Sequence, residues 1–216
     1  MADWRYTGQV NVNLPSTERG RATRARIIRA AIEAIAERGA SRLNLDDVIV
    51  RAGASKGQLY HYFDDREALL HAAVRETIDE VVTYQHGIMQ QLDSWDAIRA
   101  WFDCLVEVQE TVDARGGCPL AMLAAHLVER DEVARAALLA GFEQWEQRLE
   151  AGLMAMQERG ELLATTDAGR LATGSMASIQ GGLLLTQVRR DPDQLRIALD
   201  TAWSHLRSHA TANDDA

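Results

Sequence analysis

Proline and cysteine are scarce in this chain of 216 residues, and each scarcity narrows the possible fold. The three prolines leave long stretches without a helix breaker, and two cysteines are too few for the disulfide framework of a small secreted domain. No apolar run reaches the roughly 20 residues that a membrane-spanning helix needs, and the start of the chain lacks a signal-peptide core. The sequence therefore predicts a soluble protein of the cytoplasm.

Signatures of catalysis and of metal binding are also missing from the sequence. It contains no GxSxG, HExxH or P-loop motif. His205 and His209 are spaced like two ligands on one helix, but no third ligand follows them, so solvated side chains are the favoured interpretation. Cys118 could be an exposed sensor thiol, although no neighbour indicates a lowered pKa. We therefore expect that the protein is not an enzyme and that it binds neither a metal nor a cofactor.

Charge is divided unevenly along the chain. Residues 1–63 carry ten Lys and Arg against six Asp and Glu, whereas residues 64–216 carry thirteen against twenty-six. A basic N-terminal part beside an acidic body indicates that one end meets a polyanion while the other end has a different task.

Apolar residues recur at steps of three and four along most of the chain, and no alternating strand pattern competes with them. The sequence therefore predicts an all-α fold of about nine helices. Their expected ranges are about 18–38, 44–52, 55–63, 64–92, 98–112, 119–128, 138–156, 167–190 and 193–208. The fourth helix is expected to start at Asp64 or Asp65, and Asp64 with Glu67 resembles a capping box. The expected organisation is a flexible arm over 1–16, a three-helix helix-turn-helix domain over 17–64, a helical bundle over 65–209, and a disordered tail over 210–216.

The segment 51–63, RAGASKGQLYHYF, carries the clearest functional signal. Gly53 supplies the positive φ that a tight turn between two helices needs, and Ser55 is placed to cap the helix that follows. That helix crowds polar groups around Lys56, the only lysine of the chain. A tight turn followed by a short polar helix is typical of a helix-turn-helix, whose recognition helix lies in the major groove of DNA.

Each polar residue of this helix has a plausible task on DNA. A lysine pairs with phosphate, a glycine lets the backbone approach the duplex, and a glutamine reads adenine through a bidentate amide contact. Tyrosine and histidine side chains reach phosphates or base edges, and a second helix N-terminus at Asn44 offers another phosphate site. The candidate DNA-binding residues are Asn44, Ser55, Lys56, Gly57, Gln58, Tyr60, His61 and Arg24. The alternative is a merely solvated helix surface.

Residues of about 21–70, from RATRARIIRAAIEAIAERGA to LDDVIVRAGASKGQLYHYFDDREALL, resemble the DNA-binding domain of the TetR family of bacterial transcription regulators. The resemblance implies a homodimer whose fourth helix links the helix-turn-helix to a divergent C-terminal domain that binds a small molecule. It places the DNA contacts on Asn44, Lys56, Gly57, Gln58, Tyr60 and His61. It also makes Tyr62 and Phe63 packing residues. Gln58 stands where the family usually has threonine, so the operator preference is expected to differ.

The helix expected over 167–190 contains several small residues. Each interior glycine costs a helix about 1 kcal/mol relative to alanine, so we expect close packing to offset that cost. The resemblance implies that this helix and the last one pair across a two-fold axis, which suits a palindromic operator. The candidate interface residues are Gly181, Leu184, Leu199, Trp203 and Leu206. A core helix within one chain is the alternative.

A set of aromatic, methionine and polar side chains between helices five and eight is the candidate effector pocket. Aromatic rings and adaptable methionines suit an apolar or aromatic ligand. The candidates are Trp101, Leu105, Met122, His126, Phe142, Trp145, Met176 and Gln180. Ordinary core packing is the alternative for each of them, and a satisfied core histidine is the alternative for His126.

The sequence as a whole predicts a dimeric repressor that a small, apolar or aromatic molecule releases from a palindromic DNA operator. A transcriptional activator and a ligand-independent regulator are the alternatives within DNA binding. A small-molecule enzyme or carrier with a vestigial N-terminal domain is the rival from another class, and it would need a polar constellation that the C-terminal half does not show.

Overall fold

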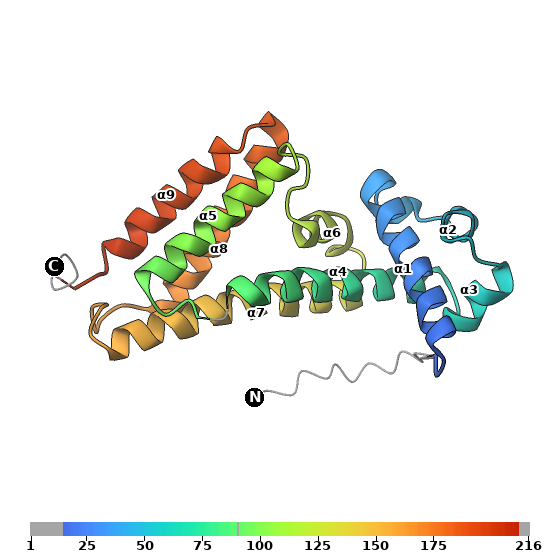
Figure 1. Cartoon of the computed structure of the whole chain (residues 1–216), viewed down its shortest axis with the longest axis horizontal. Coiled ribbons are helices and arrows are strands. Elements are labelled where there is room, and N and C mark those ends of the chain that lie inside the picture. The colour runs from blue at the N-terminus through green and yellow to red at the C-terminus, as the bar shows by residue number, and fades with distance from the viewer. Residues whose placement is uncertain (1–14, 90, 212–216) are drawn as a thin grey trace.

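The computed structural model describes residues 15–89 and 91–211, and in that part the chain forms nine α-helices and one short 3-10 helix (Figure 1). The all-α prediction is confirmed. The expected arm and tail lie outside the described residues except for residues 15–16 and 210–211. The helices are α1 (Glu18–Arg38), η1 (Ala40–Arg42), α2 (Leu45–Ala52), α3 (Lys56–Tyr62), α4 (Arg66–Ile88), α5 (Trp95–Thr111), α6 (Pro119–Leu127), α7 (Glu132–Glu158), α8 (Ala168–Arg189) and α9 (Asp193–Arg207).

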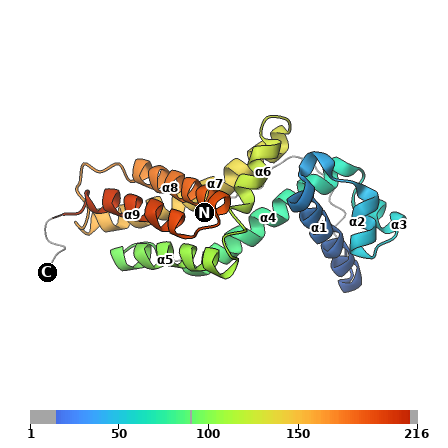
Figure 2. The same ribbon diagram turned by 90° about the horizontal axis from the view of Figure 1, so that it is seen from above.

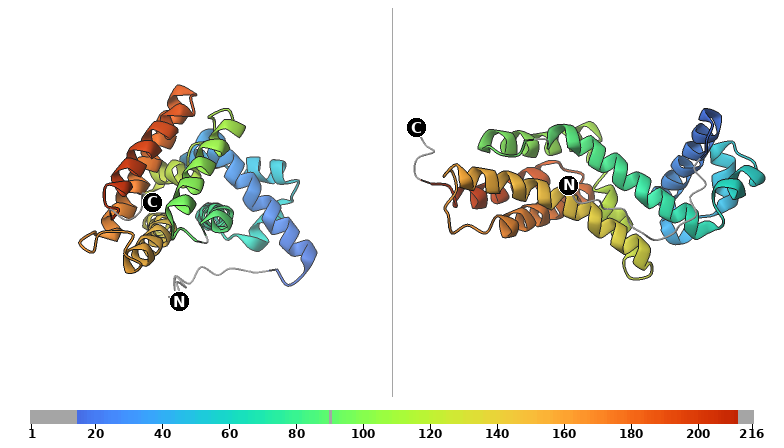
Figure 3. Two further views of the ribbon diagram at one scale, coloured as in Figure 1. Left: turned by 60° about the vertical axis from the view of Figure 1, so that its left-hand side comes forward. Right: turned by 90° about the horizontal axis from the view of Figure 1, so that it is seen from below.

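Helix α4 connects two parts of the molecule (Figure 2). Helices α1 to α3 pack together at one end and form what we call the head, whereas α5 to α9 form the body. In the body, α8 and α9 lie side by side as an antiparallel pair that α5 flanks (Figure 1). Helix α7 runs along α4, so the body packs against the connecting helix (Figure 3).

Side-chain caps explain where most of the helices begin. Carboxylate, amide or hydroxyl oxygens accept a hydrogen bond from a free backbone N–H of the first turn, which offsets the lack of a helical partner there. The capping residues are Thr17, Asn44, Ser55, Ser94, Asp131 and Asp167.

The capping and the end of α4 differ from the prediction. Asp65 Oδ1 accepts from the Ala68 N–H at 2.7 Å, so Asp65 is the cap and the expected capping box at Asp64 is wrong. The helix ends at Ile88, four residues before the expected end near Leu92.

Two glycines mark places where a helix approaches a neighbouring segment too closely for a side chain. A Cβ on Gly152 of α7 would lie 1.9 Å from the carbonyl oxygen of Leu92, and a Cβ on Gly182 of α8 would lie 2.8 Å from Leu195 Cδ1. Close packing at Gly182 therefore holds α8 against α9 within one chain. Gly174 and Gly181, on the same helix, have no such neighbour within 4 Å.

Within the described ranges, 15–89 and 91–211, no helix combines the length and the apolar character that crossing a membrane requires. In the same ranges no three side chains of His, Cys, Asp or Glu gather as metal ligands would. The rings of His205 and His209 stack edge to face with centroids 5.2 Å apart, and Nδ1 of His209 lies 3.3 Å from the Thr166 hydroxyl.

Replacing Gly152 with alanine should destabilise the protein strongly, because backbone cannot move aside as a flexible side chain does. We expect a loss of about 3 kcal/mol or more in the free energy of unfolding, measured by thermal or urea denaturation. Gly57→Ala is the matched control, since its Cβ would meet only Ser55 Oγ at 3.9 Å and should leave the stability unchanged or raised. Equal stability of the two variants would contradict the close approach of α7 to Leu92.

Candidate nucleic-acid interface and cavities

Helix α3 is anchored to the head by its inner side. A helix of seven residues is not stable alone, so it depends on packing and on its caps. Leu59 is fully buried, and Phe63, just after the helix, is 3% exposed. The predicted packing role of Tyr62 and Phe63 agrees with this placement, and a Cβ on Gly20 of α1 would lie only 3.3 Å from the Tyr62 hydroxyl.

The outer side of α3 gathers most of the residues that the sequence analysis assigns to DNA binding. Every one of them is exposed, and the helix lies at the end of the molecule away from the body (Figures 1 and 2). They are Ser55, Lys56, Gly57, Gln58, Tyr60 and His61. The turn before the helix has the expected geometry, because Gly53 adopts φ 56°. The outer side of α3 therefore presents the ammonium group of Lys56, the exposed backbone of Gly57, the phenol of Tyr60 and the imidazole of His61.

Gln58 has a second task that the sequence analysis missed. Its Oε1 accepts from the Ser55 N–H at 2.8 Å, while the Ser55 hydroxyl accepts from the Gln58 N–H at 3.1 Å. This reciprocal pair is a capping box. The expected bidentate contact with adenine needs both ends of the amide, so it would have to share this oxygen with the Ser55 N–H. The capping pattern, Ser followed by Gln three residues later, was the signal for it in the sequence.

Asn44 and Arg24 lie beside the α3 surface in different ways. Asn44 caps α2 as expected, and its Oδ1 accepts from the Asp46 N–H at 2.8 Å. The guanidinium of Arg24 lies over the Phe63 ring, 5.4 Å from its centroid, and its Nε is buried without a partner in the described part of the chain. Arg24 is half-buried on α1 and contacts the residue that follows α3, and its expected contact with DNA stays a prediction.

The predicted dimer interface divides into two groups. Leu199 and Leu206 are at most 2% exposed within their own chain, so neither can face a second copy, and that part of the prediction is wrong. Trp203 is turned toward α5, where its ring meets the edge of Trp95 at a centroid distance of 5.7 Å. Gly181 and Leu184, in contrast, are exposed on α8.

Large apolar side chains next to Gly181 are also exposed. Leu184 is 60%, Val188 70% and Ile197 61% exposed, and Leu185 lies beside them. Together with Gly174, these residues define what we call the apolar face of α8 and α9. A group of exposed large apolar side chains on two packed helices is a candidate contact site.

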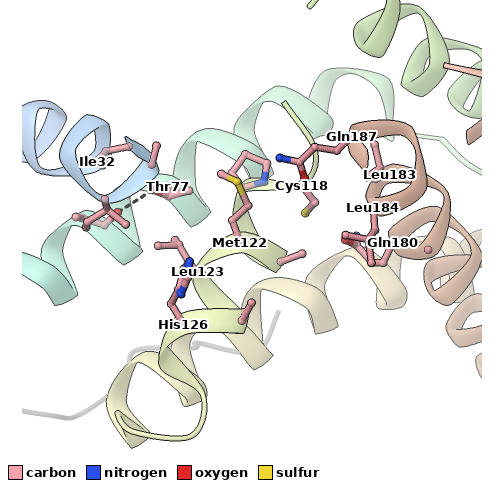
Figure 4. Close-up of a pocket in the computed structure, with 17 residues that line it drawn as sticks. Ile32, Thr77, Cys118, Met122, Leu123, His126, Gln180, Leu183, Leu184 and Gln187 are labelled. Carbon is pink, nitrogen blue, oxygen red and sulfur yellow. Dashed lines mark hydrogen bonds between the residues drawn. The ribbon is translucent and has the colours of Figure 1, made fainter. Parts of the chain in front are cut away.

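In the part of the chain that the structure describes, two cavities lie on either side of the segment that starts α6. The larger, of about 510 Å³, lies among α1, α4, α6 and α8, and we call it the seam cavity because it separates head from body (Figure 4). The smaller, of about 280 Å³, lies among α4, α5, α7 and α8, and we call it the bundle cavity. Cys118, Pro119 and Leu183 line both.

The predicted pocket residues are distributed over these cavities instead of lining one. Met122, His126 and Gln180 line the seam cavity, and Trp101, Leu105 and Trp145 line the bundle cavity. Phe142 and Met176 line neither. The prediction missed the wall of the seam cavity that α1 contributes through Ile32, Ile35 and Ala36. The signal was an apolar stripe on α1 that extends beyond the positions buried in the head.

Two alternative interpretations from the sequence are corrected by burial. His126 is exposed, not a core histidine, and its ring lies 3.7 Å from where a Cβ on Gly39 would stand at the end of α1. Cys118 is 5% exposed, and burial raises the pKa of its thiol, so the interpretation as an exposed sensor thiol is wrong.

Comparison with families of known proteins gives two matches that together span most of the chain. Residues 27–73 match the family described as bacterial regulatory proteins, tetR family. Residues 94–202 match the family described as tetracyclin repressor-like, C-terminal domain. The first match covers the recognition segment, and the second covers most of the body.

Individual relatives agree with these matches. The HTH-type transcriptional regulator Rv0196 of Mycobacterium tuberculosis is 30% identical over 179 residues, which cover 78% of this chain and 86% of the relative. The HTH-type transcriptional repressor DhaR of Mycobacterium sp. strain GP1 is 26% identical, covering 85% of this chain and 91% of its own. A TetR transcriptional regulator from Chloroflexus aurantiacus has a similar solved structure, with a TM-score of 0.78, 22% identity, and coverage of 90% and 98%.

Replacing Gln58 with alanine should lower stability, because the Ser55 N–H loses its acceptor. We expect a loss of about 0.5–1 kcal/mol in the free energy of unfolding, measured by thermal denaturation. Gln58→Glu is the matched control, since a carboxylate at this position also accepts from Ser55 and should keep the stability. If Gln58→Ala were as stable as the unchanged protein, the capping box would contribute nothing.

Proposed function

The chain belongs to the tetR family of bacterial regulatory proteins, and we propose that it is a dimeric repressor that a small molecule releases from its operator. Members of the family are DNA-binding transcriptional regulators and not enzymes. The observation that carries the proposal is the outer side of α3, an exposed polar surface on a helix whose inner side is anchored by Leu59. The repressing direction is supported by the relative DhaR, which is a transcriptional repressor.

In the proposed complex, α3 lies in the major groove and its residues make different contacts with the DNA. Lys56 pairs with a phosphate, and Gly57 lets the backbone approach the duplex without a side chain in between. Tyr60 and His61 reach base edges or phosphates, and the capped N-terminus at Asn44 holds another phosphate. Gln58 keeps one lone pair of its oxygen in the capping box, and its amide N–H groups can donate to a base edge. Sequence preference therefore rests on Gln58, Tyr60, His61 and the shape of the groove.

The proposed dimer forms through the apolar face of α8 and α9. Burying Leu184, Val188 and Ile197 against a second copy removes from water the three most exposed large apolar side chains in the described part of the body. The smallness of Gly174 and Gly181 lets two α8 helices approach each other. Two heads related by a two-fold axis would present α3 twice, about 34 Å apart, to the half-sites of a palindrome.

Release from DNA is proposed to follow from a small molecule bound in the part of the chain after the head. We assign residues 17–64 to DNA binding and 65–209 to effector binding and dimerisation, with the boundary at the start of α4. The effector must bind more tightly to the arrangement that does not fit the operator, because only a difference in affinity shifts the equilibrium.

Lys56→Ala should weaken binding to an operator that the purified protein selects from random DNA. Loss of one phosphate contact should lower the affinity about tenfold at about 0.1 M salt and reduce the slope of log K against log salt by about 1. Arg170→Ala is the control of equal charge, on an exposed position of α8 in the body. An unchanged affinity and slope for Lys56→Ala would refute the proposed reading surface.

Val188→Glu should convert the dimer to a monomer, because a charge would be buried at the centre of the contact. We expect the dissociation constant of the dimer to rise at least about a hundredfold, measured by analytical ultracentrifugation. Leu139→Glu places the same charge on α7, at a residue that is 48% exposed, and should leave the dimer intact. A Val188→Glu protein that still sediments as a dimer would exclude the apolar face as the interface.

A further inference from the structure

We propose that the seam cavity is the effector site and that it takes an uncharged, mostly apolar molecule with one hydrogen-bond donor. This inference rests on the proposed function, which requires an effector but names neither its site nor its chemistry. The sequence analysis placed the pocket between helices five and eight, whereas the seam cavity is bounded by α1 of the head.

No Lys, Arg, Asp or Glu side chain lines the seam cavity. Its polar lining consists of a threonine, a cysteine, a histidine and two glutamines, and the rest is apolar (Figure 4). An ion would lose its hydration there without an opposite charge in the lining, which costs several kcal/mol. An uncharged ligand avoids that cost and gains from contact with side chains such as Ile35, Met122 and Leu183.

One buried oxygen of the lining lacks a hydrogen-bond donor. Gln180 Oε1 is buried and has no hydrogen-bond partner in the described part of the chain. The Thr77 hydroxyl, in contrast, already donates to the Ala73 carbonyl at 2.9 Å. A buried acceptor without a partner costs about 1–3 kcal/mol, and a ligand N–H or O–H would remove that cost. The seam cavity therefore favours a ligand donor directed at α8.

The seam cavity contacts the head directly, because residues of α1 form part of its lining. Ile32, Ile35 and Ala36 on one wall belong to α1, whereas Gln180 and Gln187 on the opposite wall belong to α8. A molecule that touches both walls binds best at one separation of head and body. Its occupancy therefore biases the angle of the head directly.

The bundle cavity is the competing site, and its lining makes it less suited to this task. It is smaller, no residue of the head lines it, and the carboxylate of Glu80 is among its lining groups. It also contains buried polar atoms without partners in the described residues, Gln109 Oε1 and Trp145 Nε1. A ligand there could reach the head only through α4 or α6, which contribute residues to its lining. The experiment must therefore distinguish the two cavities.

Two dyes of the same skeleton test both the chemistry and the place. N-phenyl-1-naphthylamine is uncharged, apolar and has one N–H, and 1-anilinonaphthalene-8-sulfonate adds a sulfonate to it. We expect the neutral dye to bind the full-length dimer with one site per chain, measured by its fluorescence. The sulfonate should bind at least tenfold more weakly, because no cation lines the cavity. Equal affinity for the two dyes would overturn the requirement for an uncharged ligand.

Three variants locate the bound dye. Ala36→Phe fills the seam cavity from an exposed position of α1, and Gln180→Met removes the acceptor at similar shape; each should weaken the neutral dye about tenfold. Val108→Phe fills the bundle cavity and should leave the affinity unchanged. Melting temperatures confirm that each variant is folded. Loss of binding in Val108→Phe alone, or no binding of the dye to any of the proteins, would overturn the assignment.

The effect on DNA completes the test and keeps it separate from the proposed function. The neutral dye should weaken operator binding by the unchanged protein and not by Ala36→Phe. A dye that binds in the seam cavity and leaves the operator affinity unchanged would overturn the coupling. Failure of the proposed function would appear differently, as a protein that binds no selected operator when no dye is present.

Discussion

Helix α4 belongs to the head and to the body at once, and its packing at both ends fixes their relative orientation. At the start of α4, the Arg66 guanidinium donates to the Leu43 carbonyl at 2.9 Å. This hydrogen bond links the first turn of α4 to the residue that follows η1. A turn later, His71 Nε2 lies 2.8 Å from an oxygen of Asp131, the cap of α7. Burial raises the pKa of Asp131, but hydrogen bonds from the Ala134 N–H and from His71 outweigh it, so the pKa is lowered. The carboxylate therefore stays ionised and links α4 to α7.

Local signals in the sequence were sufficient for most helices and for the exposed polar side of α3. Ser55 could be predicted as a cap because capping involves only residues a few positions apart. Asp64 and Asp65 are adjacent carboxylates with equal capping ability, so the choice between them depends on how the chain leaves α3. The Gln58 amide can cap a helix or contact a base, and only the backbone geometry shows that its oxygen is already in use.

Contacts between distant helices could not be predicted in the same way, because periodicity finds apolar positions but not their partners. Leu184 and Leu199 look alike in the sequence, yet the first faces solvent and the second faces α8. His126 lies in an apolar run, and its exposure follows from α6 having α7 on one side and the seam cavity on another. Ile35 fitted the stripe of the head and also lines that cavity, which requires knowing where α1 meets the body.

Helix α8 joins the proposed effector site to the proposed dimer contact. Gly181 and Leu184 are shared, since they line the seam cavity and also belong to the apolar face. A ligand against α8 would therefore act beside the two-fold axis, while its contact with α1 acts on the head. The displacement needed is small, because α4 spans about 35 Å. A tilt of about 5° over that length moves α3 by about 3 Å, close to the base-pair rise of DNA, and symmetry doubles it across the dimer. A ligand in the seam cavity can thus control whether the two α3 helices of a dimer fit one operator.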